Sequence, residues 1–522
     1  MVPTSADTRS RDALLAENAK LLGDNAALKR QLAWFKRQMF GEKSEKRLFD
    51  HPDQLPIGAH LPAPPIQEQA TEVVTYTRGK GPKVRGDDCV TDTGLRFDDT
   101  VPNKIINLPV LGLEDLSEDD VELITVREYC KLAMRPASYV VLRYRQPVLK
   151  VKPTGDIVSG IAVAGTIDKS IADVSFIVGT MVDKFQYHLP LYRQHQRLQN
   201  SGIVLSRSTL LNLVKRAIML LEPIVDAQTT NILISRILAM DETPIKAGRS
   251  KARKGRMHQG YLWPIYGEHD EVVFIYKTNR NHSHVNDILG TAFTGTLLRD
   301  GYEAYDRYAS KHAGVTSAQC WAHTRRHFVE ARDSDPSSVD EVVAMIGELY
   351  EVEKDLREQS LEGEKKHNCR VTRSKPIVNQ IFEWAEDQLQ RLDLVPGDPY
   401  LKAVNYLYSR KQDLSVFLED PDVPLDTNHL ERQIRPVAMG KRSWLFCWTE
   451  LGAKHVGIIQ SLICTCKLHG IDPYTYLIDV LQRINIHPDS QIMDLTPRLW
   501  KEKFADDPMG SDLEIAVNDG VE

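Results

Sequence analysis

The sequence predicts a multidomain α/β protein with a mixed β-sheet in its middle part. Three observations lead to this fold class. The chain has 522 residues, which is enough for several domains and a large hydrophobic core. A seven-residue apolar repeat occupies residues 11–39, which predicts a long N-terminal helix. Short apolar runs typical of strands then alternate with helical patterns over residues 233–321.

Composition excludes several classes of protein. Hydrophobic residues make up 42% of the chain and charged residues 26%, as in ordinary globular proteins. The net charge is −6, so any surface that binds a polyanion must be a local basic patch. No apolar run approaches the roughly 20 residues of a membrane span, and the first residues have no apolar core of a secretory signal. Together with seven scattered cysteines, these features predict a cytoplasmic protein with reduced thiols.

Residues 1–50 are predicted to form a coiled-coil dimerisation helix. Asn18 and Asn25 fall at a positions of the heptad, where a buried asparagine costs stability but fixes the register of a parallel pair. We therefore expect self-association through residues 11–39. The alternative is an amphipathic helix that packs on its own domain. The residues at the seven-residue spacing are Leu14, Leu21, Leu28 and Phe35.

Two segments connect this helix to the rest of the chain. Residues 51–85 are rich in Pro, Gln and Gly and are predicted to be a linker. The linker ends in "RGKGPKVRG", which suits either a basic arm that touches a nucleic-acid backbone or a solvated tether. Residues 86–165 combine apolar runs such as "SYVVLRYRQPVLKV" with the acidic stretch "LEDLSEDDVEL", and we expect a small α+β module.

Residues 166–232 have a helical pattern that is interrupted by a turn at Asn200-Ser201-Gly202. A second helix should begin near Ser206 or Ser208, either of which can cap it. This spacing fits a helix-turn-helix unit whose second helix would place Arg207 and Lys215 in a major groove. Ordinary packing of two helices is the alternative.

Residues 233–450 carry the predicted mixed sheet. Strand-like runs occur in "RILAMDETPI", "GYLWPIYG", "EVVFIYK" and "GTLLRDGYEAY", and a helix is expected over about 283–290, before the fourth run. Because such a crossover is nearly always right-handed, the fourth strand should lie beside the first and parallel to it. A helical insertion is expected at about 335–415. Residues 451–522 should add two helices around His469-Gly470 and a loose polar tail beyond about 491.

Three carboxylates are predicted to meet at one edge of this sheet. Asp241 and Asp300 follow the first and fourth strands, whose carboxyl ends would be adjacent. Glu431 comes from a later helix and lies in a stretch of cations, where a lone carboxylate would repel a bound polyanion unless it holds a metal ion. Close carboxylates raise one another's pKa, and Mg²⁺ or Mn²⁺ relieves this repulsion. We expect two such ions, about 4 Å apart, as in metal-dependent phosphodiester cleavage.

Each acid also has a simpler interpretation. Asp300 precedes Gly301 and could begin a turn, and Glu431 could pair with Arg435 one helical turn later. Asp426 is expected to cap a helix rather than to bind metal. Glu242 adjoins Asp241, but successive strand residues point to opposite faces, so we expect an orienting or surface role for it.

The pattern Asp241, Asp300 and Glu431 resembles the DDE triad of transposases with a ribonuclease-H-like catalytic domain. The chain is similar to transposases of the bacterial insertion sequence sixty-six family. The resemblance extends over most of the chain, from the N-terminal heptads to "SLICTCKLHGIDPYTYLIDVL". Five motifs carry it in order, and such an ordered set is far more specific than any single motif. The other four are "MDETP", "RDGYEAY", "CWAHTRRHF" and "NHLERQIRPVAMGKRSWLF".

The resemblance implies a DNA transposase that cleaves insertion-element ends and joins them to target DNA by metal-dependent phosphodiester hydrolysis and transesterification. Its partners would be the terminal inverted repeats, the target DNA and small accessory proteins that family elements often encode. Two alternatives stay open. One is a non-catalytic DNA-binding protein that pairs ends or acts as a repressor. The other is a metal-dependent nuclease that cannot join strands.

The chain departs from the family in one region. Family members usually carry a small zinc module with two CxxC pairs after the zipper, whereas residues 86–165 contain only Cys89 and Cys130. Two distant cysteines without histidine partners cannot close a four-ligand site, so we expect no zinc. The pair Cys320 and His323 lacks two further ligands, and it is either a buried structural pair or, as the resemblance implies, a place where His323 acts on the DNA.

Cations near the expected site predict the DNA contacts. The loop "KAGRSKARKGRMH" follows the first strand and contains no acid. A solvated hairpin tip is the alternative to a DNA-backbone contact there. Together with His323, the expected DNA-binding residues are Arg249, Lys251, Arg253, Lys254, Arg256, Arg325, Arg326, Arg432, Arg435, Lys441 and Arg442.

Overall fold

The computed structural model describes most of the chain beyond residue 95. The predicted coiled coil, the linker, Cys89 and the loop cations Lys251, Arg253 and Lys254 lie outside the described residues. Asp88–Arg391 and Pro399–Glu522 form one compact unit that contains every helix and strand of the described part. The described residues are 96–97, 101–110, 121–135, 138–161, 165–167, 170–249 and 256–514.

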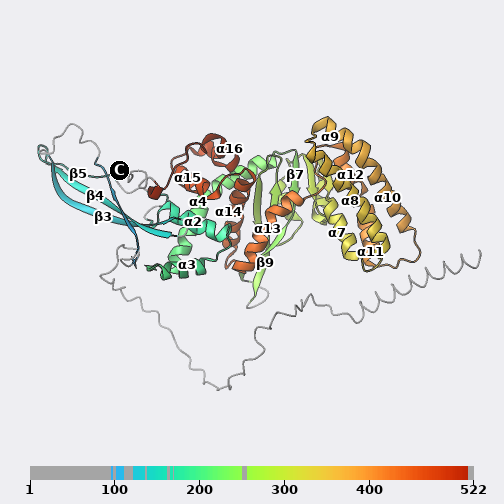
Figure 1. Ribbon diagram of the computed structural model, residues 1–522, viewed down its shortest axis with the longest axis horizontal. Coiled ribbons are helices and arrows are strands. Elements are labelled where there is room, and N and C mark those ends of the chain that lie inside the picture. Colours follow the sequence, from blue (N-terminus) through green and yellow to red (C-terminus); the bar gives the residue numbers. More distant parts are fainter. Residues whose placement is uncertain are drawn as a thin grey trace, which may run out of the picture. The chain divides into compact units, whose positions relative to one another are not determined.

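A small β-sheet forms the described part of residues 86–165 (Figure 1). Its main feature is an antiparallel pair of long strands, β3 (Val121–Arg135) and β4 (Ser138–Val151). The flanking strands β2 (Asn103–Asn107) and β5 (Ile157–Ser159) both pair with β4. The described residues of this module contain no helix, so the α+β expectation is not met there. The apolar runs of β3 and β4 satisfy their backbone groups by pairing with each other.

The next segment contains the helix, turn and helix that the sequence predicts. After α2 (Val174–Phe185), helix α3 (Leu191–Asn200) is followed by a turn in which Gly202 has a φ of 75°. The short strand β6 (Ile203–Val204) pairs with β1 (Arg96–Phe97). Ser206 then caps α4 (Arg207–Leu233) by accepting a 3.0 Å hydrogen bond from the Thr209 amide. Arg207 is exposed and Lys215 is half-buried; DNA contact by either residue stays a prediction.

The central sheet has the strand order β10-β9-β7-β11-β12, with β8 paired to β9. The antiparallel strands β8 (Thr243–Arg249), β9 (Met257–Tyr266) and β10 (Val272–Lys277) lie on one side of β7 (Ile237–Met240). On the other side, β11 (Gly295–Arg299) pairs in parallel with both β7 and β12 (Val315–Gln319). The predicted mixed sheet, with the fourth strand parallel to the first, is therefore confirmed.

Helices connect and cover the strands of this sheet. The crossover from β10 to β11 contains α5 (Ser283–Leu289), and α6 (Glu303–Lys311) connects β11 to β12. Helix α7 (Trp321–Ala331) follows β12. Helix α14 (Glu450–Leu468) closes the edge strand β10, because the Phe274 and Val272 amides donate to Ser461 Oγ at 2.9 Å and to Thr465 Oγ1 at 3.1 Å.

The expected helical insertion follows α7. It contains α8 (Pro336–Glu358), α9 (Gly363–Cys369), a π-helical segment η2 (Arg370–Ser374), α10 (Lys375–Leu389), α11 (Pro399–Tyr408) and α12 (Lys411–Glu419) (Figure 1, yellow to orange). The Trp321 indole donates to the Leu414 carbonyl at 2.9 Å. This contact joins α7, at the end of the sheet, to the last helix of the insertion.

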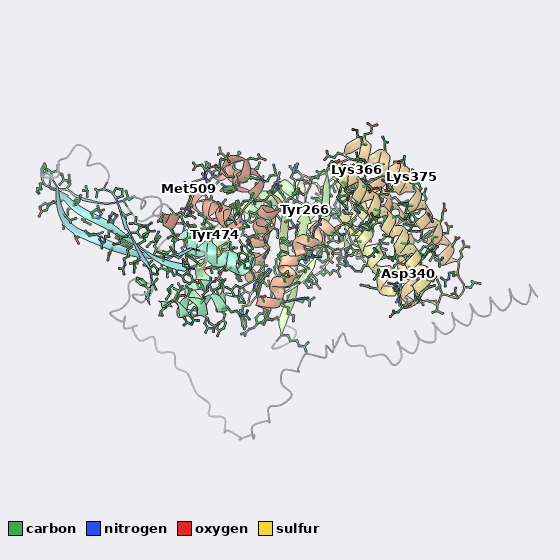
Figure 2. The ribbon with its side chains drawn as sticks, viewed as in Figure 1. Tyr266, Asp340, Lys366, Lys375, Tyr474 and Met509 are labelled. Carbon is green, nitrogen blue, oxygen red and sulfur yellow. The ribbon has the colours of Figure 1, made fainter. Side chains whose placement is uncertain are left out.

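The C-terminal segment is packed, so the prediction of a loose tail beyond about 491 is wrong for the described residues. Helix α15 (Pro473–Arg483) contacts η3 (Asp489–Leu495) and α16 (Pro497–Lys503). The Trp500 side chain is buried, and its indole donates to Asp479 Oδ1 at 2.9 Å. The Met509 amide donates to the other Asp479 oxygen at 2.7 Å, and the Tyr474 hydroxyl of α15 donates to the Met134 carbonyl of β3 at 3.4 Å (Figure 2 labels Met509 and Tyr474). A buried aromatic residue, Trp500, therefore anchors the otherwise polar segment beyond residue 491.

Within the described residues, no helix has both the length and the apolar character that crossing a membrane requires.

Candidate active site

Asp241 and Asp300 lie side by side because two parallel strands are in register. Ala239 of β7 pairs with Leu298 of β11, and each aspartate follows its paired residue by two positions. Both therefore emerge at the same carboxyl edge of the sheet, where open α/β sheets bind their ligands. Asp300 also begins a turn, since its Oδ1 accepts a 2.9 Å hydrogen bond from the Tyr302 amide. The turn fixes the carboxylate and does not exclude it from the site.

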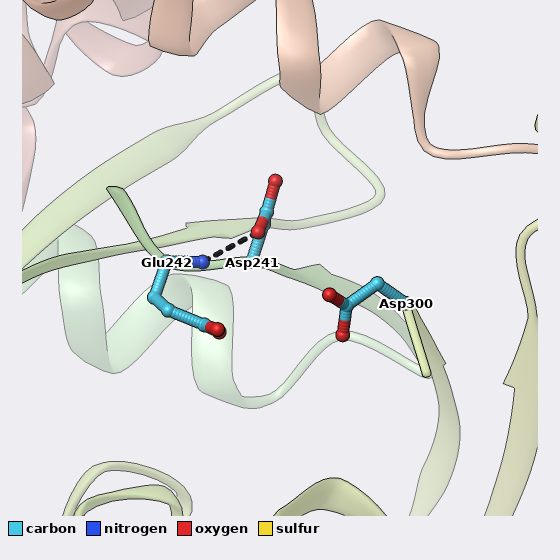
Figure 3. A group of neighbouring side chains, drawn as sticks. All are labelled: Asp241, Glu242 and Asp300. Carbon is cyan, nitrogen blue, oxygen red and sulfur yellow. Dashed lines mark hydrogen bonds between the residues drawn. The ribbon is translucent and has the colours of Figure 1, made fainter. Parts of the chain in front are cut away.

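Glu242 joins the two aspartates, contrary to the expectation that it would point to the other face. One ligand oxygen from each of the three residues lies within 4.8 Å of the others (Figure 3). Strand alternation does not apply here, because β7 ends at Met240 and β8 begins only at Thr243. The two acids therefore lie in the bend between the strands. The Glu242 amide donates to Asp241 Oδ1 at 2.6 Å, which holds the aspartate carboxylate in place.

Two residues that the sequence did not single out hold Glu242. Arg280 forms an ion pair with one carboxylate oxygen, and the Tyr305 hydroxyl donates to the other at 2.8 Å. The Glu242 side chain is only 2% exposed. Tyr305 is fully buried on α6, five residues beyond Asp300, so its contact with Glu242 joins the two halves of the cluster.

Burial and neighbouring charges raise the pKa of two of the carboxylates. Burial, followed by the charges of Glu242 and Asp300, raises the pKa of Asp241 to about 8. Burial and the charge of Asp300 also raise the pKa of Glu242, although Arg280 opposes this shift. A cluster of this kind favours either a bound proton or a bound cation. The donors are all carboxylate oxygens, which suits a hard divalent cation.

Glu431 lies near this cluster but is not one of the residues whose ligand atoms all lie within 4.8 Å of one another. It is in the first turn of α13 (Asn428–Trp444), and its charge contributes to the raised pKa of Asp241. Its carboxylate accepts hydrogen bonds from Arg326 at 3.3 and 3.4 Å and lies 3.6 Å from His323 Nε2. The prediction of close convergence is thus confirmed for Asp241 and Asp300, and Glu431 faces the same region while paired with α7. The simpler interpretation paired Glu431 with Arg435, whereas its arginine partner is Arg326.

Cys320 and His323 have different surroundings. Cys320 is buried at the start of α7, and its sulfur accepts hydrogen bonds from the Thr427 amide and hydroxyl, both at 3.3 Å. Burial raises the pKa of its thiol to about 11, so it is a structural link between α7 and the start of α13. Burial lowers the pKa of His323, whose Nε2 faces Glu431. The sequence predicts Asp426 as the cap of α13, but the N-cap residue is Thr427; Asp426 precedes it and accepts a 2.9 Å hydrogen bond from the Asn428 amide.

Arg299 is a further residue that the sequence prediction missed. Its side chain is fully buried and forms ion pairs with Asp306 of α6 and, at 2.6 Å, with Asp413 of α12. It also donates to the Asp300 carbonyl at 2.9 Å, so it holds the backbone of a cluster residue. The sequence does contain a signal for this role, because Arg299 lies between the apolar run of β11 and Asp300. A cation inside a buried strand requires acidic or carbonyl partners.

The predicted DNA-binding cations fall into three groups. Arg249 and Arg256 are exposed at the β8–β9 hairpin, whose tip lies outside the described residues. Arg325 and Arg326 are exposed on α7. On α13, Lys441 donates to Thr243 Oγ1 at 3.0 Å and to the Pro244 carbonyl at 2.6 Å, which fastens the helix to β8. The other cations of α13 are exposed: Arg432, Arg435 and Arg442.

Three family models match the chain. The model described as "Transposase IS66 family" matches residues 169–455, and "IS66 C-terminal element" matches residues 461–498. "Transposase C of IS166 homeodomain", a leucine-zipper region, matches residues 27–87 and overlaps the predicted coiled coil.

Similar proteins include three uncharacterised proteins of Sinorhizobium fredii (strain NBRC 101917 / NGR234). Protein y4hP is 31% identical over 351 residues, which are 62% of this chain and 62% of y4hP. Protein y4jD is 30% identical over 358 residues, covering 65% of this chain and 68% of y4jD. Protein y4qI is 27% identical over 391 residues, which are 72% of this chain and 70% of y4qI. The chain thus spans less than two thirds of the length of y4hP. Because the first family model covers more than half of the chain, the chain belongs to the IS66 family of transposases.

Proposed function

We propose that this chain is a DNA transposase that cuts the ends of an insertion element and joins them to target DNA. The observation that carries the proposal is the group of Asp241, Glu242 and Asp300, whose ligand atoms lie within 4.8 Å of one another beyond two parallel strands. Membership of the IS66 transposase family supports the reaction class. The DNA partners would be the terminal inverted repeats and a target duplex.

The cluster suits Mg²⁺ or Mn²⁺. Its oxygen donors match the preference of these ions. Burial and then the neighbouring carboxylates raise the pKa of Asp241, and a bound cation would offset both effects. Asp241 and Asp300 would hold the first ion, and Glu431 would complete the ligands of a second. When bound, two such ions about 4 Å apart activate the attacking oxygen and stabilise the leaving oxygen of a phosphodiester.

The protein residues around the cluster would orient these ligands and the DNA. Glu242 uses both carboxylate oxygens for Arg280 and Tyr305, so we assign it a positioning role. Glu431 would have to exchange its hydrogen bonds with Arg326 for a cation. Arg326 and its neighbour Arg325 would then be free to contact phosphate, since guanidinium groups bind phosphate oxygens in pairs. Water and later a DNA 3′-hydroxyl would serve as nucleophiles, so no covalent protein–DNA intermediate is needed.

A strand-transfer assay tests the proposal. The full-length protein is incubated with oligonucleotide duplexes carrying its element ends, Mg²⁺ and a target plasmid. Asp241→Asn, Asp300→Asn and Glu431→Gln should each abolish cleavage and joining while retaining end binding in a gel-shift assay. Glu303→Gln is the matched control, because Glu303 lies on α6 close in sequence to Asp300 but pairs with Arg307 at 2.8 Å.

Other results of this assay would favour a different function. Cleavage without joining by the wild-type protein would indicate a nuclease. End binding without cleavage in either Mg²⁺ or Mn²⁺ would indicate an end-pairing or repressor protein. Joining by the Asp241 and Asp300 variants would refute the assignment of the catalytic residues.

A further inference from the structure

The loop after α13 presents a tryptophan to solvent. Residues 445–448, here named the aromatic loop, connect α13 to α14. Trp448 is 68% exposed and Leu445 is 66% exposed. Most of the Trp448 indole thus faces solvent, and tryptophan is enriched at binding interfaces. By contrast, the preceding Trp444 turns inward and contacts Phe185 edge-on, with ring centroids 5.6 Å apart.

The backbone of the aromatic loop is fixed on both sides. At its start, the Phe446 amide donates to the Trp444 carbonyl at 2.8 Å, and Leu445 between them has a φ of 67° and a ψ of −54°. These values describe a γ-turn of the rare, strained kind. At its end, Cys447 pairs with β8: its amide donates to Lys246 at 2.8 Å, and its carbonyl accepts from Gly248 at 3.0 Å. The loop therefore presents Trp448 from a defined position, with the Phe446 ring edge-on at 5.0 Å.

The helix that leads to this loop exposes cations. No carboxylate occurs in the chain between Glu431 and Glu450. The exposed residues Arg432, Arg435, Met439 and Arg442, here named the α13 stripe, follow one another at intervals of three, four and three residues. Such spacing puts them on one face of a helix. The stripe thus leads from the region of Glu431 to the aromatic loop, and its charge fits a polyanion.

The distance from the acidic cluster to the loop can be estimated from β8. Cys447 is bridged to Ala247, which follows Asp241 of the cluster by six residues. At about 3.3 Å per extended residue, this separation is roughly 20 Å. Consecutive phosphates on one DNA strand advance about 3.4 Å, so the loop would lie roughly six nucleotides from a phosphate at the cluster.

We propose that Trp448 stacks on an unpaired base of the bound DNA, roughly six nucleotides from the phosphate at the acidic cluster. The inference rests on the proposed function, because it places DNA along the α13 stripe. Bases of an intact duplex are stacked on their neighbours, so an indole can pair with a base face only where the DNA is opened or a base is extruded. The protein should therefore prefer DNA with unpaired bases, and Trp448 should be the source of that preference.

The test compares two fluorescein-labelled DNAs of equal length by anisotropy: a fully paired duplex and a fork with unpaired bases at one end. The wild-type protein should bind the fork more tightly. Trp448→Ala should weaken fork binding roughly 5- to 150-fold, the range found when a stacking aromatic is removed, and should change duplex binding little. Trp448→Phe should keep most of the preference, whereas Trp448→Leu should lose it. Ile234→Ala is the control, because Ile234 is also an exposed apolar residue, at 80%.

Several outcomes would overturn the inference. One is an equal loss of fork and duplex binding in Trp448→Ala, and another is wild-type behaviour of Trp448→Leu. A lower mass of Trp448→Ala in light scattering, with the fork preference intact, would assign the loop to a protein contact instead. If the wild-type protein binds neither DNA, the proposed function fails and the inference fails with it. Because Trp448 is exposed, the variants should fold, and their thermal unfolding midpoints check this.

Discussion

Replacing Arg370 by methionine should destabilise the helical insertion far more than an ordinary surface substitution. Arg370 is fully buried in the π-helical segment η2. Its guanidinium bonds both oxygens of Glu353 on α8, at 2.8 and 2.9 Å. Its remaining nitrogen, which has two hydrogens to donate, lies 2.8 to 3.2 Å from four backbone carbonyls of the segment that leads toward α13. These carbonyls belong to Phe417, Asp420, Pro421 and Val423.

The magnitude follows from what the substitution leaves behind. Methionine fills part of the volume but donates no hydrogen bond, so Glu353 keeps a charge at a site where its side chain is only 10% exposed. Removing one partner of a buried ion pair costs about 3 to 5 kcal/mol. At about 1.4 kcal/mol per tenfold change, a cost of 3 kcal/mol raises the population of the open state by roughly 100-fold or more.

Hydrogen exchange of the folded protein measures this opening locally. Amides of α8 and η2 should exchange roughly 100-fold faster in Arg370→Met, while amides of β10 and α14 should change little. Arg373→Met is the matched control from the same π-helical segment. Its ion pair with Asp355, at 2.7 Å, joins side chains that are 45% and 39% exposed, and such exposed pairs contribute little to stability. Equal effects of the two substitutions would refute the reasoning from burial.

Asp173→Asn should be as stable as the wild-type protein below about pH 4 and increasingly more stable as the pH rises toward neutrality. Burial raises the pKa of Asp173 in the folded protein, near Lys131 and Asp512, so ionisation of this carboxyl favours unfolding. The measurement is the thermal unfolding midpoint of both proteins as a function of pH. Parallel curves for the wild-type protein and the variant would contradict the expectation. Arg326→Gln should tighten Mn²⁺ binding by up to about fivefold in calorimetry, because Glu431 loses a competing partner; unchanged affinity would exclude Glu431 as a ligand. Glutamine replacements in the α13 stripe should flatten the logarithmic salt dependence of DNA affinity by roughly 0.9 per lost phosphate contact, measured by anisotropy. The replaced residues are Arg432, Arg435 and Arg442. An unchanged slope of affinity against salt would place the DNA on another surface.

The arrangement of Asp241 and Asp300 was predictable because two general rules determine it. The crossover connection makes β11 run parallel to β7, and both aspartates follow their strands directly. The helical insertion was also predictable, since long charged segments with helical periodicity leave few other choices. Both conclusions depend on the backbone alone.

Side-chain partners were less predictable. The error about Glu242 came from extending strand alternation past Met240, where the strand ends. The pairing of Glu431 with Arg326 joins residues that are 105 positions apart, and it depends on how α7 and α13 pack. No local pattern contains that information. The C-terminal contacts of Trp500 have the same character, because one buried indole can anchor a polar segment.

These differences suggest how the parts of the site divide their roles. The aspartates are held by strand register, by the Glu242 amide and by Arg299, all of which belong to the sheet or contact it directly. Glu431 depends instead on α13, whose start is bonded to Cys320 and whose preceding segment is held by Arg370 of the insertion. The position of Glu431 relative to the aspartates therefore depends on the helical insertion. With Glu431 bonded to Arg326, the aspartates form a fixed half-site, and a cation that draws Glu431 in would release a guanidinium beside the DNA phosphate. Metal binding and phosphate binding would then favour each other through a single exchange of partners.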